Sequence, residues 1–243
     1  IKAALSLDDK GLLGSIINEN KKIKATPNSI IPEILYQLNE LKDSSVFQNF
    51  PDFRSLDNVS KMVIDNYYKE WKADVILDRG PWGTPYNLRV IKQFIPKPKF
   101  VVLFRPLIEC LASFAKLKID NGFNTKEDIR EYIDELMDEE GMIGKSILSI
   151  KNLCKEKEDY KIFYYNDLVE DTDNFLKNLS SFIGFKINNY NRLKQFNVNN
   201  TYYQDTVKNL HRIRVKKIKR QTYDINDYLP EDIIEKYSAY KII

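Results

Sequence analysis

The stretch Lys99-Phe-Val-Val-Leu-Phe-Arg105-Pro106-Leu-Ile-Glu-Cys-Leu-Ala-Ser113 is the most informative part of this chain. Its five apolar residues predict a buried strand, because the run is too short and too rich in Val and Phe for a helix. Pro106 suits the first position of a new helix, where its missing N–H group costs nothing. Arg105 is therefore expected where a parallel strand ends and a helix begins, the usual place of a ligand site in an open α/β sheet.

The helix after Arg105 is expected to carry one polar face. Four polar residues recur at spacings of four, three and four, which puts them on one side of a helix: Glu109, Ser113, Lys116 and Asp120. A guanidinium and a hydroxyl that converge can bind a phosphate, because arginine offers a planar fork of donors and serine adds one more. Arginines at strand ends also serve as surface ion-pair residues, and many helical serines are inert. The spacing alone leaves both interpretations open.

Strand and helix patterns alternate along the whole chain. Buried strands are expected over residues 1–7, 73–77, 100–104 and 161–165, and residues 43–56 are expected to form a loop. One or two long helices are expected in residues 125–157, interrupted near Gly141 and Gly144. The other expected helices cover residues 12–20, 30–41, 58–71, 86–94, 106–120, 173–183 and 230–240. This order predicts an α/β fold, a single domain over residues 1–243 with a mostly parallel sheet flanked by helices.

The composition is that of a folded globular protein, with 243 residues, 43% hydrophobic and 12% aromatic. The net charge of +3 is too small to argue for a nucleic-acid partner. Two cysteines and one histidine give no disulfide framework and no metal-ligand spacing, so we expect a reducing compartment and no metal. No membrane-spanning segment or signal peptide is visible, which predicts a cytoplasmic or otherwise soluble intracellular protein without a membrane partner. The first residue is Ile1, so a preceding segment stays open.

The chain resembles the sulfotransferases that use 3′-phosphoadenosine 5′-phosphosulfate (PAPS), and most closely the tyrosylprotein, bacterial and phage members. Arg105 and Ser113 match, at the same spacing, the arginine and serine that hold the 3′-phosphate in that family. Tyr165 begins a Tyr-x-x-Leu-x-x segment that lies against the nucleotide in the family. The resemblance covers nearly the whole chain and implies a P-loop-like sulfotransferase architecture with PAPS, or its product PAP, as co-substrate.

Two further segments take part in the resemblance. Arg79 falls where the tyrosylprotein enzymes carry a lysine near the transferred group. Residues 211–220 are rich in Lys and Arg, contain no acidic residue, and resemble the C-terminal segment that covers the nucleotide. That resemblance implies cofactor contacts from Arg212, Arg214 and Lys217. Judged from charge alone, the same stretch could be a solvated loop. Nucleic-acid binding is disfavoured because no aromatic residues interleave with its charges.

The first loop departs from the family pattern. The family carries Pro-Arg/Lys-Ser-Gly-Thr/Ser-Thr around the 5′-phosphosulfate, whereas residues 6–11 read Ser-Leu-Asp-Asp-Lys-Gly. Gly11 and the helix that begins near Leu12 remain, and Lys10 could supply positive charge. Asp8 and Asp9 have the wrong sign, because a like charge about 4 Å from a phosphate costs roughly 4 kcal/mol at an effective dielectric constant near 20.

The proton acceptor of the reaction also departs from the pattern. In the tyrosylprotein enzymes a glutamate precedes an Ile-Ile-Pro element, and this chain keeps Ile30-Ile31-Pro32 without a carboxylate before it. Glu33 and Asp78 are the nearest alternatives, and each could instead be a surface or capping residue. The resemblance therefore implies Arg79, Lys10 and Glu33 as catalytic residues, and Arg105, Ser113, Tyr165, Gly11 and Leu12 as further cofactor contacts.

Three functions are compatible with these residues. The favoured one is transfer of a sulfuryl group from PAPS to a hydroxyl of a small molecule, glycan or peptide. The altered first loop and the absent glutamate favour an alternative, a non-catalytic module of the same fold that binds PAP or PAPS. A triphosphate-dependent kinase is disfavoured, because Asp9-Lys10-Gly11 lacks the glycine and lysine spacing of a nucleoside-triphosphate loop. Residues 43–56 and 120–145 are the expected acceptor-facing insertions.

Overall fold

The centre of the molecule is a parallel five-stranded sheet with the strand order β2-β3-β1-β4-β5. The computed structural model describes residues 2–6, 12–17, 22–26, 29–95, 97–187, 193, 197–198, 201–202, 218 and 223–242. The strands are β1 (Lys2–Ser6), β2 (Ile23–Ala25), β3 (Val75–Arg79), β4 (Phe100–Phe104) and β5 (Tyr160–Tyr164). Four of them were predicted, and β2 adds a fifth at the edge, beside β3.

Strand β4 is covered on both faces, which explains why its sequence is a continuous apolar run. Phe100 and Val102 belong to one hydrophobic core, and Val101 and Leu103 to the other, all at most 1% exposed. The chain leaves β1 toward the β2 edge and leaves β4 toward the β5 edge. Ligands of open α/β sheets bind outside the carboxyl ends of strands at such a reversal, so the site is expected beyond β1 and β4.

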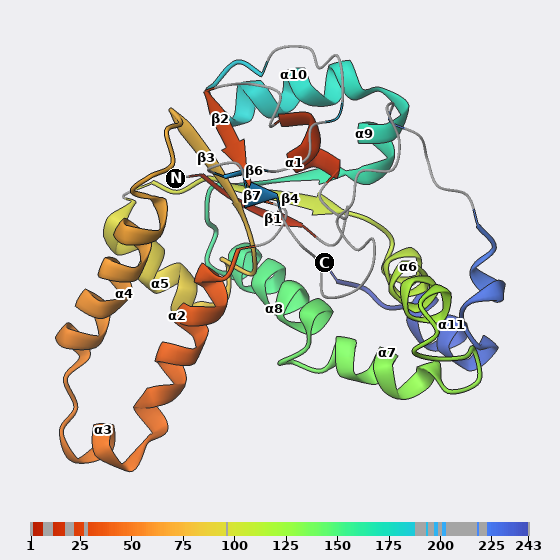
Figure 1. Ribbon diagram of the computed structural model, residues 1–243, viewed down its shortest axis with the longest axis horizontal. Coiled ribbons are helices and arrows are strands. Elements are labelled where there is room, and N and C mark those ends of the chain that lie inside the picture. The colour runs from red at the N-terminus through yellow and green to blue at the C-terminus, as the bar shows by residue number, and fades with distance from the viewer. Residues whose placement is uncertain are drawn as a thin grey trace.

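Helices cover both faces of the sheet and complete three layers (Figure 1). One face carries α1 (Leu12–Ile17), α9 (Tyr165–Glu170) and α10 (Thr172–Ile183). The other carries α2 (Ile31–Glu40), α4 (Phe53–Tyr68), α5 (Pro85–Phe94), α6 (Leu107–Asp120), α7 (Ile129–Met137), α8 (Met142–Lys155) and α11 (Glu231–Ser238). The predicted α/β fold with a parallel sheet flanked by helices is confirmed.

Short elements complete the described chain. They are the 3₁₀ turns η1 (Leu41–Asp43) and η2 (Ile225–Asp227), helix α3 (Ser45–Asn49), and the antiparallel pair β6 (Asn197–Val198) and β7 (Thr201–Tyr202). Helices α2, α3 and α4 form a hairpin that projects from the body, with α3 at its tip (Figure 1).

The prediction of a loop over residues 43–56 is wrong. Helix α3 starts after Ser44, whose side chain accepts a hydrogen bond from the N–H of Phe47. Helix α4 starts after Asp52, which caps it by accepting from the N–H of Ser55 at 2.9 Å. A serine or aspartate at such a position satisfies one of the unpaired amides of the first turn. The two capping residues mark the starts of these helices, and a prediction based on apolar periodicity alone does not detect them.

The interruption predicted in residues 125–157 is confirmed, since α7 ends at Met137 and α8 begins at Met142. Gly141 precedes α8, whereas Gly144 lies inside its first turn. A Cβ atom on Gly144 would lie 1.8 Å from the carbonyl oxygen of Asp138, and one on Gly141 would lie 2.1 Å from that of Glu135. Both glycines therefore permit close backbone contact between the turn and the end of α7.

Candidate functional site

Arg105 lies at the carboxyl end of β4, where the chain turns into α6, as predicted. Pro106 has φ −51° and ψ 130° and precedes the helix, which starts at Leu107, one residue later than expected. Its carbonyl accepts hydrogen bonds from the N–H groups of Glu109 and Cys110, so the proline supplies the first acceptor of the helix. The Arg105 residue is only 7% exposed.

Three side chains orient the Arg105 guanidinium. Its Nε donates to Glu109 Oε2 at 3.1 Å, and one NH2 group donates to the hydroxyl of Tyr223 at 3.4 Å. The central guanidinium carbon lies 4.8 Å from the centre of the Tyr165 ring, within the range of a cation–π contact. Tyr223 also donates from its hydroxyl to the carbonyl of Glu109 at 3.3 Å. The plane and the direction of a buried cation are thereby set before any ligand arrives.

Ser113 lies one turn after Glu109 on α6 and is 2% exposed. Its spacing of four from Glu109 puts both residues on one face of the helix. The Ser113 hydroxyl makes no hydrogen bond to any residue that the structure describes. Glu109 thus links the two predicted phosphate contacts, because it holds Arg105 and precedes Ser113 by one turn.

The remaining polar face of α6 is covered by the segment 223–229. Lys116 Nζ donates to Asp120 Oδ2 at 2.8 Å and to the hydroxyl of Tyr228 at 2.9 Å. The Lys116 ammonium also lies 4.6 Å from the centre of the Tyr228 ring. Tyr223 and Tyr228 pack edge to face, with ring centres 5.6 Å apart. A segment close to the C-terminus therefore lies along the predicted polar stripe.

Tyr165 is the first residue of α9, whereas the sequence predicted it as the last residue of a strand. Its ring is buried beneath Arg105. Leu168, three residues on, is fully buried in the core beneath α9 and α10. The Tyr-x-x-Leu spacing thus turns both side chains inward, one to Arg105 and the other to the core.

Asp78 and Arg79 form the carboxyl end of β3. The Asp78 carboxylate is fully buried and accepts hydrogen bonds from Thr26 Oγ1 at 3.1 Å and from Trp82 Nε1 at 3.0 Å. Burial raises the pKa of Asp78 to about 6, against the opposing effect of its hydrogen-bonding neighbours Tyr68, Ser29, Thr26 and Trp82. Because its side chain is closed to solvent, Asp78 cannot meet an acceptor molecule directly.

Arg79 is the last residue of β3, whereas it was expected just after the strand. Its N–H group donates to Thr26 Oγ1 at 3.2 Å, and its carbonyl accepts from the N–H of Ser29 at 3.1 Å. The Thr26 hydroxyl therefore connects the buried carboxylate of Asp78 to the backbone of Arg79. These two bonds hold the backbone of Arg79 on both sides of its Cα atom.

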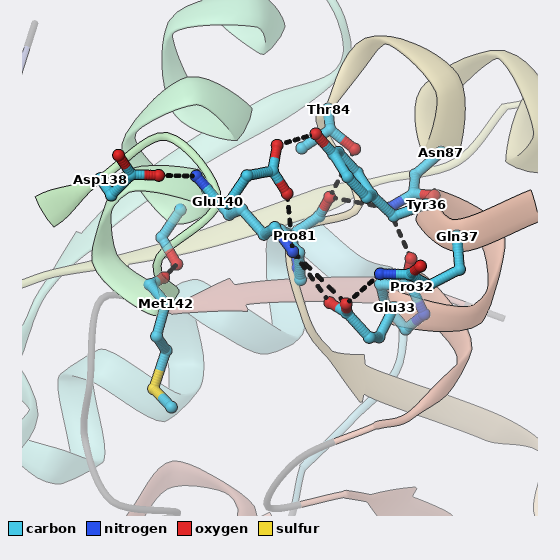
Figure 2. A network of polar contacts seen from close by, with 12 residues as sticks. Pro32, Glu33, Tyr36, Gln37, Pro81, Thr84, Asn87, Asp138, Glu140 and Met142 are labelled. Carbon is cyan, nitrogen blue, oxygen red and sulfur yellow. Dashed lines mark hydrogen bonds and ion pairs between the residues drawn. The ribbon is translucent and has the colours of Figure 1, made fainter. Parts of the chain in front are cut away.

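Glu33 lies in the first turn of α2, beside the turn that follows Arg79. The ring of Pro32 packs on Gly80, where a Cβ atom would lie 2.4 Å from Pro32 Cγ. Asn87 Nδ2 donates to the carbonyl of Pro32 at 3.1 Å and to that of Pro81 at 3.3 Å (Figure 2). The start of α2 is thus fixed at the Arg79 end of β3, and the side chain of Glu33 is 49% exposed.

Several predicted site residues lie outside the described residues, namely Lys10, Gly11, Arg212, Arg214 and Lys217, together with Asp8 and Asp9. Leu12 is the first residue of α1, which follows β1. Within the described ranges, no three His, Cys, Asp or Glu side chains gather as a metal site would require. The helices that the structure describes include none long and apolar enough to cross a membrane.

Sequence reasoning missed the tyrosines and the lysine that complete these contacts. Tyr223 reaches Arg105 from 118 positions away, so no local pattern could pair them. Thr26 follows a three-residue strand that no apolar run announced. Lys145 lies in an amphipathic helix. The nearby Gly141 and Gly144 predicted an interruption of that helix but not the close packing around Lys145.

Fold and site together define an α/β protein whose buried arginine and serine could hold a phosphate beyond the carboxyl ends of a parallel sheet. The family model of the sulfotransferase domain matches residues 84–241, more than half of the chain, so the protein belongs to the sulfotransferase domain family. Sulfuryl transfer is the general activity of that family, and the matched residues include Arg105, Ser113 and Tyr165.

Two solved structures are similar at low sequence identity. The sulfotransferase domain of the Synechococcus PCC 7002 olefin synthase aligns with a TM-score of 0.48 and 15% identity, over 77% of this chain and 74% of that one. The sulfotransferase domain from the curacin biosynthetic pathway aligns with a TM-score of 0.46 and 15% identity, over 76% of this chain and 74% of that one. No curated protein sequence matches the chain.

Proposed function

We propose that this protein transfers a sulfuryl group from PAPS to a hydroxyl acceptor. The observation that carries the proposal is the arrangement around Arg105, which is buried at the end of β4, lies over Tyr165 and is oriented by Glu109. Ser113 is buried on the same helix face. A planar guanidinium and a nearby hydroxyl suit the oxygens of a 3′-phosphate.

On the donor side, Arg105 and Ser113 hold the 3′-phosphate, and Tyr165 packs against the nucleotide side of the site. These contacts lie far from the reacting sulfur, and their binding free energy serves to orient the sulfur for attack. Lys116 and the segment 223–229 extend the same face of α6. Arg212, Arg214 and Lys217 are proposed to cover the nucleotide, and Gly11 and Leu12 to approach the 5′-phosphosulfate.

In the transfer step the acceptor oxygen attacks sulfur in line. The bond between sulfur and the 5′-phosphate oxygen breaks, PAP leaves, and the acceptor proton passes to the Glu33 carboxylate. Arg79 and Lys10 offset the negative charge on the transferring group and the leaving phosphate. The hydrogen bonds that hold the backbone of Arg79 support this role, because charge stabilisation requires a fixed donor.

A second candidate is a module of the same fold that binds PAP or PAPS without turnover. Asp8 and Asp9 favour it, because two carboxylates at the position of the family's phosphosulfate loop oppose the negative charge of the transferring group and the leaving phosphate, while the 3′-phosphate contacts remain. The missing glutamate before Ile30 favours it as well. The two candidates share the 3′-phosphate site and differ only in whether PAPS is consumed. The acceptor class, whether small molecule, glycan or peptide, and a soluble intracellular location remain predictions.

Ligand-induced thermal stabilisation tests the shared site. A ligand at about 100 times its dissociation constant adds about 2.7 kcal/mol to the unfolding free energy. PAP should stabilise the parent and Arg89→Ala, whose arginine pairs with Asp57 on the surface, but not Arg105→Ala. ADP, which has no 3′-phosphate, should add little. Equal stabilisation by ADP and PAP would contradict the 3′-phosphate assignment.

Turnover separates the two candidates. PAPS is incubated with the parent and a panel of phenolic, sugar and alkyl hydroxyl acceptors, and release of PAP is followed. Transfer to any of these acceptors supports the enzyme. PAP binding without consumption of PAPS supports the binding module.

A further inference from the structure

Lys145, in the first turn of α8, is a buried lysine to which the proposed reaction gives no role. Its side chain is 10% exposed. Its Nζ lies 3.2 Å from Glu33 Oε2 and 3.4 Å from Glu33 Oε1, and 3.3 Å from Glu140 Oε2. One ammonium group therefore serves two carboxylates that come from different parts of the chain.

An aromatic ring closes another side of the same ammonium. Lys145 Nζ lies 4.4 Å from the centre of the Tyr36 ring, and the Tyr36 hydroxyl donates to Glu140 (Figure 2). Gln37 Nε2 donates to Glu33 Oε1 at 3.2 Å. A buried ammonium is costly unless it is paired, so these partners account for its position. The cluster joins α2 to the turn between α7 and α8.

Both ends of this connection are fixed by the backbone. Gly141 and Gly144 allow the turn before α8 to fold against the end of α7, which brings Glu140 and Lys145 together. At the other end, Pro32 packs on Gly80 and holds the start of α2 beside Arg79. The Glu33 side chain thus extends from a fixed backbone toward a fixed ammonium.

Of the two described carboxylates that the sequence offers as proton acceptors, Glu33 and Asp78, Glu33 is the one that solvent reaches. It follows Pro32 directly and its side chain is 49% exposed, whereas Asp78 is fully buried. Glu140 is exposed as well, but it belongs to the α7–α8 turn and meets α2 through Tyr36 and Lys145. Glu33 is therefore the carboxylate of this cluster that directly follows the proline packed on the Arg79 turn, and Glu140 is the second carboxylate paired with the same ammonium.

We propose that Lys145 is a positioning residue that holds Glu33 for proton transfer and that Glu140 keeps Lys145 paired during that transfer. The inference rests on the proposed sulfuryl transfer. The O–H bond of the acceptor breaks and its proton goes to Glu33, while the acceptor oxygen bonds to sulfur and the sulfur–phosphate oxygen bond breaks. Glu33 becomes neutral in this step, and Glu140 remains as the counter-charge of the buried ammonium. Lys145 itself exchanges no proton.

The first test compares kcat, the KM for PAPS and PAP binding in a set of variants. Glu33→Gln should lower kcat by about 100-fold or more, the usual contribution of a general base. Lys145→Met should lower kcat by about 10- to 100-fold, the usual effect of a misplaced catalytic group, and Lys145→Arg should recover most of it. PAP binding should stay within about twofold in all three, because the 3′-phosphate site is separate. Lys92→Met, which breaks the ion pair of a half-exposed lysine with Glu158 outside the cluster, is the matched control and should retain the parent kcat.

The double variant distinguishes positioning from a general structural effect. If Lys145 acts through Glu33, adding Lys145→Met to Glu33→Gln should cost little further kcat, because coupled residues are not additive. A full additional loss would overturn the proposal, as would Lys145→Met with the parent kcat.

Glu140→Gln is the second, milder variant if Lys145→Met does not fold. It leaves Lys145 paired only with Glu33, so proton uptake would strand the ammonium, and kcat should fall by about tenfold with PAP binding unchanged. An unchanged kcat would overturn the role of Glu140. A parent that binds PAP but turns over no acceptor would overturn the proposed sulfuryl transfer itself. Because the parent is assayed first, this outcome is distinguished from a failure of the role proposed for Lys145.

Discussion

One NH2 group of Arg105 donates to the hydroxyl of Tyr223, which in turn donates to the carbonyl of Glu109 in α6. The arginine at the end of a central strand is thus oriented partly by a residue 118 positions later in the chain. The C-terminal part of the protein belongs to the candidate phosphate site for this reason, and its contribution can be measured.

Tyr223→Phe should weaken PAP binding by about 3- to 10-fold. The substitution keeps the ring and its contact with Tyr228 but removes two hydrogen bonds, each worth about 0.5–1.5 kcal/mol when formed within a protein. Titration calorimetry with PAP gives the affinity. Tyr240→Phe is the control, because Tyr240 lies on the surface after α11 and is 39% exposed. Equal affinities for the parent and Tyr223→Phe would show that Tyr223 does not orient Arg105.

Arg105→Lys should weaken PAP binding by about 10- to 100-fold although the charge is kept. Lysine lacks the planar fork that bonds a phosphate at two points, and it cannot keep the same flat contact with Tyr165. Hydrogen bonds to charged groups are worth about 1.5–3 kcal/mol each, which sets this range. The difference in melting temperature with and without PAP measures the effect. Retention of the parent affinity would mean that only net charge is recognised.

The contribution of Asp78 to the free energy of unfolding should fall as the pH rises from about 4 to above 6. Burial raises the pKa of Asp78 in the folded state to about 6 from its ordinary 3.8. The folded state then binds the proton more tightly than the unfolded chain, so its stabilising contribution is complete below pH 4 and is lost through pH 6. At about 1.4 kcal/mol for each pKa unit, the loss is on the order of 3 kcal/mol.

Urea unfolding of the parent and of Asp78→Asn at several pH values isolates this effect. The difference in unfolding free energy between the two should change between pH 4 and pH 7, because the amide does not titrate. Asp78→Asn should also be less stable at low pH, since its amide N–H would face the indole N–H of Trp82 in place of an acceptor. Parallel pH profiles for both proteins would contradict a raised pKa at Asp78.

Gly80→Ala should destabilise the fold by about 1–3 kcal/mol, the usual cost of an overpacked site. The added Cβ atom would lie 2.4 Å from Cγ and 3.2 Å from Cβ of Pro32, so the start of α2 would have to move away from Arg79. Gly14→Ala is the matched control, because its nearest neighbour, Ala25 Cβ, is at an ordinary 3.6 Å. Chemical denaturation measures both. An undiminished stability of Gly80→Ala would show that the contact with Pro32 relaxes freely.

The parts of the fold that could be predicted are those encoded by contiguous residues. The strand, turn and helix around Arg105 form one local pattern, and the structure reproduces it to within a residue at Pro106. Strand β2 escaped because it has only three residues and the middle one is Lys24, so it gives no apolar run. Helix α3 and the first residues of α4 escaped, because the starts of these helices depend on side-chain caps at Ser44 and Asp52 rather than on periodicity.

The candidate site was predictable only where a single segment supplies it. Arg105, Glu109 and Ser113 follow from helical spacing, whereas their contacts with Tyr165 and Tyr223 arise from tertiary packing. Lys145 illustrates the same limit, since its partners come from α2 and from the turn before α8. Side-chain contacts between residues so far apart in the sequence depend on how the whole core packs, and local patterns in a single sequence do not predict them.

The close backbone contact at Gly144 has a consequence for redesign. Because even a methyl group there would lie 1.8 Å from the carbonyl oxygen of Asp138, Gly144 does not tolerate a larger residue, and the same holds for Gly141 beside Glu135. Attempts to give the protein a new acceptor by grafting loops should therefore leave residues 138–145 intact. The projecting tip of the α2–α4 hairpin, where Val46 and Phe50 are largely exposed, offers a place where sequence can be exchanged without disturbing that joint.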